Sequence, residues 1–88
     1  MSAADSGGGT SPLRAVLEVV ARALVDHPES VTVTETERRG MNLLELRTAP
    51  DDMGKIIGRQ GRTAAALRTL VAVTAEKHGT RAQLDIKD

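Results

Sequence analysis

The sequence predicts an α+β domain in which helices cover one face of a mixed three-stranded sheet. Three features support this prediction: segments with apolar residues at helical spacing, segments that alternate apolar and polar residues, and a glycine-bounded turn between two helical segments. The expected order is helix, strand, strand, short helix, turn, helix and strand. With 88 residues and no Phe, Tyr or Trp, the chain can form one small domain with an aliphatic core.

The first helix is expected to follow a flexible tail. Residues 1–11 are rich in Ser, Gly, Ala and Thr, and they bury too little apolar surface to offset the entropy of ordering them. We therefore expect a tail over residues 1–11 and a domain over residues 12–88. Pro12 suits the first turn of a helix that Ser11 can cap, and Pro28 should end that helix near residue 26. Its expected apolar face consists of Leu13, Val16, Leu17, Val20 and Leu24.

Three segments have the alternating pattern of strands. Residues 31–36 and 42–48 are expected to pair as an antiparallel hairpin, joined by a link over residues 37–41 in which Gly40 supplies positive φ. Residues 81–87 form the last strand, with Ala82, Leu84 and Ile86 facing inward. Because two helices separate this strand from the second one, a parallel pairing through a right-handed crossover is expected.

Two helical segments lie between the second and third strands. The first is short, covers residues 53–57 and can be capped by either Asp51 or Asp52. The second runs from Thr63 to His78 and should end at Gly79. Its expected apolar stripe consists of Leu67, Leu70, Val71 and Thr74.

Gly58 and Gly61 form a Gly-x-x-Gly turn that two isoleucines precede and a basic, helix-forming run follows. Glycine has no Cβ, so the backbone can adopt positive φ there and approach a ligand closely. The helix that begins near Arg62 or Thr63 should direct unpaired N–H groups and a partial positive charge towards the turn. The pattern predicts a cradle for a sugar-phosphate backbone.

The charge distribution favours an anionic ligand near this turn. The net charge is zero, but residues 1–52 carry five basic and nine acidic side chains, and residues 53–88 carry seven basic and three acidic ones. Lys55, Arg59, Arg62 and Arg68 lie in a stretch without any acidic residue. A local positive field is therefore compatible with a neutral chain, although an ordinary solvated helix face is the alternative.

Other classes of function have less support in the sequence. The chain has no cysteine for disulfides or thiolate metal sites, and it shows neither a membrane-spanning run nor a secretion signal, so a cytoplasmic location is expected. The glycine spacing matches neither a dinucleotide-binding fingerprint nor a Walker A loop. His27 and His78 lie at expected helix ends, where a capping or dipole role is the default. We therefore expect no catalysis, no cofactor and no bound metal.

The segments 52–63 and 67–71 resemble the KH domain in its type II arrangement, and more closely the small bacterial single-KH proteins of the KhpA (YlqC-like) family. The resemblance extends over about residues 13–87. It implies binding of single-stranded RNA, because the Gly-x-x-Gly loop of KH domains clamps the backbone of about four nucleotides beside a shallow apolar groove.

The resemblance also implies roles for individual residues. Arg59 should bind phosphate oxygens and Gln60 should form a hydrogen bond, while Ile57, with Ile56 and Leu46, would form the groove floor unless they are ordinary core residues. The implied RNA-binding set is Lys55, Ile57, Gly58, Arg59, Gln60, Gly61, Arg62 and Arg68.

Without aromatic residues for base stacking, and with only a short link at residues 77–80, binding should be weak and low in sequence specificity. The resemblance implies self-pairing or pairing with a larger Jag-type KH protein, and a role as an RNA chaperone or post-transcriptional regulator linked to cell shape and cell wall biogenesis. The alternative is a protein-interaction module, in which Ile56, Ile57 and the neighbouring helix bind another domain without RNA.

Overall fold

The computed structural model describes residues 11–88, so the expected tail lies outside these residues apart from Ser11. The helices are α1 (Pro12–Leu24), α2 (Met53–Ile57) and α3 (Arg62–Lys77), and the strands are β1 (Thr32–Arg38), β2 (Met41–Arg47) and β3 (Arg81–Lys87). Short 3₁₀ turns occur at Pro28–Ser30, Pro50–Asp52 and Arg59–Gly61. The predicted order of elements is confirmed.

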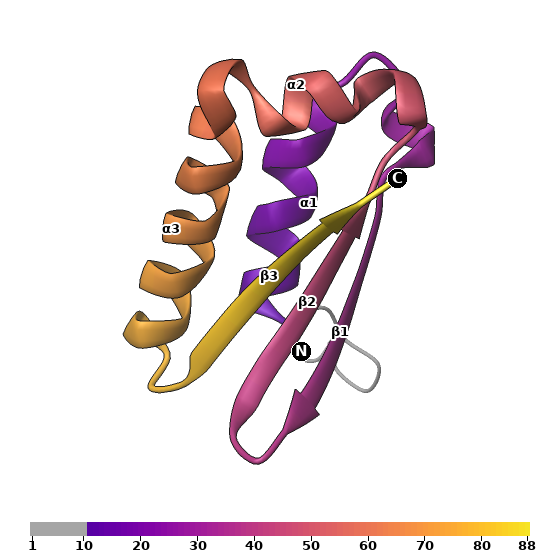
Figure 1. Cartoon of the computed structure of the whole chain (residues 1–88). Helices are drawn as coiled ribbons and strands as arrows, with labels where there is room; N and C mark the ends of the chain where they lie inside the picture. The colour runs from indigo at the N-terminus through magenta and orange to yellow at the C-terminus, as the bar shows by residue number, and fades with distance from the viewer. Residues whose placement is uncertain (1–10) are drawn as a thin grey trace.

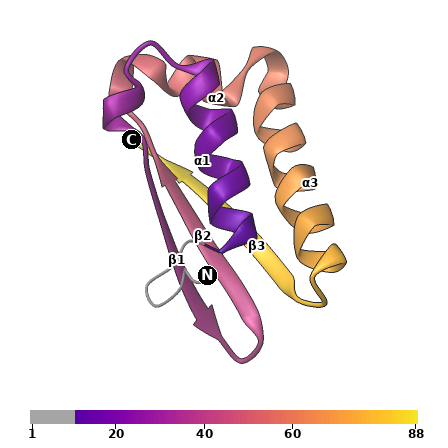
Figure 2. The same ribbon diagram turned by 180° about the vertical axis from the view of Figure 1, so that it is seen from behind.

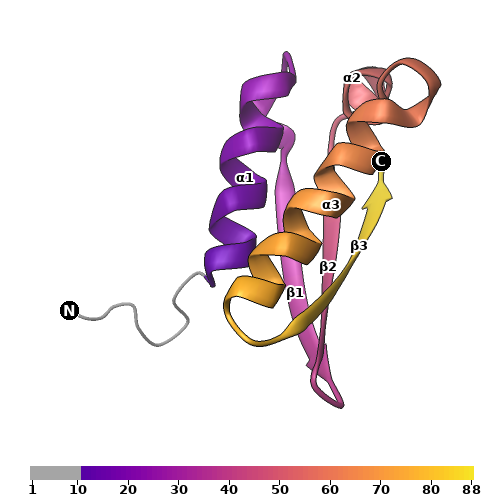
Figure 3. The same ribbon diagram turned by 90° about the vertical axis from the view of Figure 1, so that its left-hand side faces the viewer.

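The three strands form one sheet in the order β1-β2-β3 (Figure 1). β1 and β2 are antiparallel with Val33 opposite Leu46, and β2 and β3 are parallel with Leu46 opposite Ile86, as the sequence predicts. α1 and α3 lie side by side on one face of the sheet (Figures 2 and 3). The other face is not covered by a helix of the described chain (Figure 3).

The core lies between the sheet and the helices and is largely the predicted one. In α1, Ser11 Oγ accepts a hydrogen bond from the Arg14 N–H at 3.1 Å, and the buried residues are Leu13, Leu17 and Ala21. The prediction for Leu24 was wrong, because Leu24 is the last helical residue and is 38% exposed. Val25, where the backbone becomes extended, packs against the core in its place.

The inner face of α3 differs in part from the predicted stripe. Leu67 and Val71 are buried as expected, but Leu70 and Thr74 are only half-buried. The other buried positions of this helix are Ala64 and Ala75. Alanine lets a helix approach its neighbours closely. Because alanine is only weakly apolar, these two positions were not included in the predicted apolar stripe. The predicted end at Gly79 is confirmed, since Gly79 has a φ of 72° after the last turn of α3.

The link between β1 and β2 is shorter than the sequence suggested. The strands extend to Arg38 and resume at Met41, so only Arg39 and Gly40 form the turn. Both have positive φ, 52° and 78°, as in the type I′ turns whose twist matches that of a hairpin. The expected five-residue loop was wrong because strand pairing continues through polar residues whose side chains are exposed.

Asp52 does not cap α2, and neither does Asp51, because no side chain caps that helix. Instead Asp52 is 1% exposed, and its two carboxylate oxygens accept hydrogen bonds from the N–H groups of Asp26 at 3.1 Å and His27 at 3.0 Å. Burial alone would raise the pKa of Asp52, but these two hydrogen bonds and the Lys55 charge outweigh it and hold the pKa below its usual value. The carboxylate joins the segment after α1 to the start of α2.

We predict that Asp52→Asn lowers the melting temperature, because an amide oxygen can replace one carboxylate acceptor but the amide nitrogen cannot accept the second N–H bond. Since the pKa of Asp52 is lowered in the folded state, its contribution is complete above the ordinary aspartate pKa and is lost as pH falls through the folded value. Urea unfolding of the unmodified protein and of the Asp52→Asn variant should show a smaller difference in the free energy of unfolding at acidic pH than at neutral pH. The exposed neighbour gives a control, Asp51→Asn, and equal effects of the two substitutions would contradict this assignment.

Candidate nucleic-acid interface

The Gly-x-x-Gly loop lies between α2 and α3 at one end of the molecule (Figure 1). Its backbone is ordered by its own hydrogen bonds: the Gly58 N–H donates to the Gly54 carbonyl at 2.8 Å, and the Gly61 N–H donates to the Gly58 carbonyl at 3.1 Å. The Arg62 N–H donates to the Arg59 carbonyl. The expectation that α3 begins with a free amide was therefore wrong for Arg62, because a 3₁₀ turn leads directly into the helix.

The two glycines are required for different reasons. Gly58 has a φ of 77°, and a Cβ on it would lie 2.2 Å from Thr63 Oγ1 and 2.7 Å from Thr63 Cβ. Gly61 has a φ of 73°, but a Cβ there would meet no atom within 4 Å. Between them Gln60 also has a positive φ, 58°. Gly58 thus fixes the packing of the loop on α3, whereas Gly61 leaves open space that a ligand backbone can enter.

The exposed side of the loop carries Arg59, Gln60 and Arg62. The prediction that Arg59 and Gln60 project into solvent is confirmed. Arg62 Nη2 donates a hydrogen bond to Gln60 Oε1 at 3.1 Å, so these two side chains are held together. Arg68 is exposed too, but it follows Arg62 by about 9 Å along the axis of α3 and is turned to a different side of the helix. The structure therefore brings Arg59 and Arg62 to the loop and places Arg68 farther along the helix.

Lys55 is only partly available to an anion. Its Nζ lies 3.0 Å from Asp26 Oδ2 and 4.0 Å from Asp52 Oδ1. The hydrogen bond with Asp26, the charge of that group and the more distant carboxylates of Asp52 and Asp51 raise the pKa of Lys55. The segment after α1 and the turn before α2 thus supply acidic groups, which reduce the positive potential of Lys55 beside the loop.

The apolar residues beside the loop divide into core and surface. Ile56 and Leu46 are completely buried, so their expected place on a groove floor was wrong. They belong to the core because α2 directs Ile56 towards the sheet. The same burial removes Ile56 from the docking surface of the protein-interaction alternative. Ile57 is half-buried and directly precedes Gly58, so it is the apolar side chain of this set that a base can reach.

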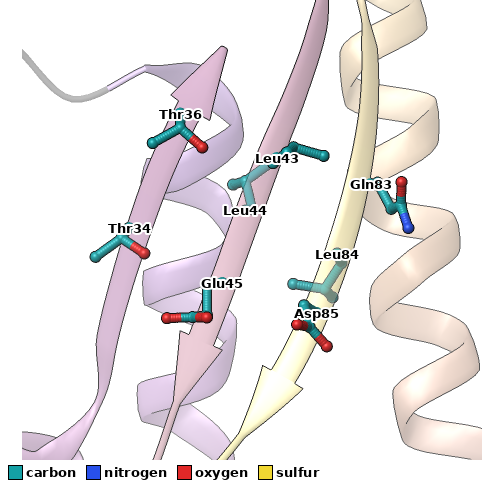
Figure 4. Close-up of a pocket in the computed structure, with 8 residues that line it drawn as sticks. All are labelled: Thr34, Thr36, Leu43, Leu44, Glu45, Gln83, Leu84 and Asp85. Carbon is teal, nitrogen blue, oxygen red and sulfur yellow. The ribbon is translucent and has the colours of Figure 1, made fainter. Parts of the chain in front are cut away.

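A hollow of about 660 Å³ lies elsewhere, on the sheet face that no described helix covers (Figure 4). No motif in the sequence indicated it, because its lining residues come from three strands that only the fold brings together. The carboxylates of Glu45 and Asp85 line it, and Lys87 Nζ lies 3.0 Å from Glu45 Oε2. The hydrogen bonds from Lys87 and Arg47 lower the pKa of Glu45, so the carboxylate is held in its charged form. Arg47 and Lys87 neutralise these carboxylates, so the hollow has no net positive charge to offer a phosphate backbone.

Within residues 11–88, no group of three or more His, Asp or Glu side chains is arranged to hold a metal ion. No helix in this part of the chain is both long and apolar enough to cross a membrane.

The geometry predicts unequal effects of adding a methyl group to the glycines of this region. Gly58→Ala should cost more than about 2 kcal/mol, because it combines positive φ with overlap against Thr63. Gly61→Ala should cost about 1 to 2 kcal/mol from the positive φ alone. Gly54→Ala is the control, because Gly54 lies in α2 and a Cβ there would meet no atom within 4 Å. This substitution should stabilise the protein by about 0.5 to 1 kcal/mol. Urea unfolding measures all three, and equal losses for Gly58→Ala and Gly61→Ala would contradict the packing described for Gly58.

Comparison with known proteins agrees with this geometry. A family model described as the KH domain of KhpA and KhpB matches residues 14–86. A protein from Halalkalibacterium halodurans named RNA-binding protein KhpA is 49% identical over 76 residues, covering 86% of this chain and all of that protein. A protein of the same name from Treponema pallidum is 48% identical over 73 residues, covering 83% of this chain and 91% of that protein.

Among solved structures, a variant of Era from Aquifex aeolicus bound to GDP and AlF4− matches 90% of this chain with a TM-score of 0.60 and 20% identity. The match spans 32% of the Era chain and shows a common fold alone. The type II KH arrangement expected from the sequence is confirmed by the order of the elements and by the mixed sheet. Together, the family match over residues 14–86 and these relatives show that the chain belongs to the KhpA/KhpB family of KH-domain proteins.

Proposed function

We propose that this protein binds single-stranded RNA by holding its phosphate backbone at the loop from Gly58 to Gly61. The observation that carries the proposal is the exposed pair of arginines, Arg59 and Arg62, on a Gly-x-x-Gly loop whose conformation is fixed from within. KH domains clamp about four nucleotides with this loop. The name RNA-binding protein KhpA, given to relatives that are 49% and 48% identical, supports the same ligand.

Each residue of the loop has a role that its surroundings permit. Arg59 is exposed and can form charge-assisted hydrogen bonds with phosphate oxygens. Arg62 uses one N–H group on Gln60, and a guanidinium has further donors for a phosphate. Gly61 allows the RNA backbone to approach, and Ile57 offers an apolar contact to a base. Arg68 adds positive field along α3, while Lys55 adds less because Asp26 pairs with it.

The proposed binding is weak and discriminates little between sequences. The chain has no aromatic residue, so it lacks the stacking that contributes about 1 to 3 kcal/mol per base in other single-strand binders. The connection from α3 to β3 consists of residues 78–80 and offers little additional surface. Phosphate contacts fix position on a strand but carry no sequence information. We propose no catalytic role for the chain.

Association with a second KH domain would compensate for weak binding. We propose that the protein acts in the cytoplasm as a homodimer or with a larger Jag-type KH protein, as an RNA chaperone or post-transcriptional regulator linked to cell shape and cell wall biogenesis. The family resemblance supports this part of the proposal, and so does the small core, which association can stabilise. Val19 on α1 and Val73 on α3 are 69% and 56% exposed and are available to such a partner.

We predict that Arg59→Asp combined with Gln60→Asp lowers the affinity for single-stranded RNA by at least about tenfold, since it replaces phosphate contacts by repulsion. Both side chains are exposed, so the circular dichroism spectrum and the melting temperature should change little. Fluorescence anisotropy with a labelled oligouridylate measures the affinity.

The control combines the same residue types at exposed positions away from the loop, Arg22→Asp with Gln83→Asp. This control changes the net charge by the same amount as the loop variant and should leave most of the RNA binding intact. Equal losses in both variants would indicate a response to net charge alone. Undiminished binding by the loop variant would refute the proposed RNA site, and a protein that ignores RNA but self-associates would favour the interaction-module alternative.

A further inference from the structure

Three arginines gather at the end of the molecule opposite the Gly-x-x-Gly loop. Arg38 ends β1, Arg39 lies in the hairpin turn, and Arg81 begins β3. The register places Arg38 opposite Met41 and Met41 opposite Arg81, so two of the arginines lie in one row across the sheet. With neighbouring strands about 4.8 Å apart, these two positions are about 10 Å apart. We call Arg38, Arg39 and Arg81 the hairpin-end patch.

The charges of this patch are not neutralised within the described chain. All three arginines are exposed, and none takes part in an ion pair among residues 11–88, whereas Arg14, Arg22 and Arg47 each lie within 4.0 Å of a carboxylate. The nearest acidic positions along the chain are Glu37, beside Arg38, and Asp85, four residues after Arg81. Such a group of unpaired positive charges produces a local positive potential that attracts a polyanion.

Arg39 also has an unfavourable local conformation. Its φ of 52° is the first positive value of a two-residue hairpin turn, a position at which Asn, Asp or Gly is strongly preferred. Arginine offers the turn no conformational advantage there. A residue that departs from the local preference without a structural gain is more readily explained by a contact to another molecule.

The third helix connects the loop with the hairpin-end patch. α3 begins at the loop and runs to the end of the molecule where β3 starts (Figures 1 and 3). Its 16 residues span about 24 Å at about 1.5 Å each. Arg62, Arg68 and Lys77 lie along the length of this helix on different sides of it, and its single acidic residue is Glu76. By strand alternation Arg38 and Arg81 face the same side of the sheet as the hollow of Figure 4, so a strand that follows α3 would have to pass round the β3 edge to reach them.

We propose that the hairpin-end patch is a second phosphate-binding site for the RNA strand held by the loop. At about 3.4 Å per stacked nucleotide, the 24 Å along α3 corresponds to about seven nucleotides, in addition to the four at the loop. The chain then engages a strand of about eleven nucleotides, within the range known for single-strand binders. This inference rests on the proposed function of the loop, and it adds the length of the bound RNA strand and the direction in which that strand leaves the loop.

The test compares oligouridylates of about 5 and about 15 nucleotides, because only the longer one can reach both sites. The variant combines Arg38→Thr with Arg39→Asn. Threonine suits a strand and asparagine suits positive φ in a hairpin turn, so the fold should be retained or strengthened while two positive charges are removed. The control combines Arg14→Gln with Arg22→Gln, which removes two arginines that pair with Glu18 on α1. Dissociation constants are measured between about 0.05 and 0.2 M salt.

The salt dependence separates the outcomes. Loss of two phosphate contacts should reduce the slope of log K against log salt by about 1.4 for the longer RNA. For two proteins that bind equally at 1 M salt, this change makes the variant bind about 25-fold more weakly than the unmodified protein at 0.1 M salt. The shorter RNA should bind the variant as it binds the unmodified protein, and the control should bind both RNAs normally.

An unchanged slope for the longer RNA would overturn the second site. A slope that falls equally for both lengths would also overturn it, because the patch would then be the primary site. Failure of the loop itself has a different signature, since Arg59→Asp with Gln60→Asp would then leave the binding of the shorter RNA unaltered.

Discussion

The packing of the Gly58 backbone against Thr63 determines how the chain passes from α2 into α3. No Cβ fits at Gly58, and the φ of 77° sets the direction in which the loop leaves the short helix. The two helices are anchored on either side, by Ile56 in the core and by Ala64 and Leu67 beneath the first turns of α3. Because these anchors are buried, the residues between them are forced outward. The exposure of Arg59 and Arg62 is thus a consequence of aliphatic packing.

A second constraint acts through charge. Asp52 is buried at the start of α2 and uses both carboxylate oxygens on the backbone that follows α1. Lys55 turns towards Asp26 in the same region. Acidic side chains among residues 1–52 therefore act beside the loop: Asp52 fixes the start of α2, and Asp26 partly neutralises Lys55, the nearest lysine. The positive surface offered to RNA is narrower than the run of basic residues suggests, and it depends on arginines at the loop and along α3.

The sequence predicted local features well. The short helix at 53–57 and the last strand at 81–87 have the expected bounds, because the glycine after the helix and the alternation of the strand are read from neighbouring residues. The hairpin and the positive φ of Gly40 were predicted, but the turn was expected over residues 37–41 and is shorter, because strand pairing overrides the local preference of Arg39. The hydrogen bond that the Asp26 N–H donates to the Asp52 carboxylate joins residues 26 positions apart, and no periodic pattern encodes it. Ile56 and Ile57 look alike in sequence, and only tertiary packing distinguishes the buried one from the half-buried one.

The account places RNA at a loop whose backbone is already ordered, so binding should change the environment of the loop without refolding the domain. Titration of isotopically labelled protein with a short oligouridylate, followed by amide chemical shifts, tests this directly. The account predicts that the largest shifts fall on residues 58–62, that they weaken as salt rises, and that the amides of the buried core move little. Shifts confined to α1 or to the uncovered sheet face, with an unchanged loop, would contradict it.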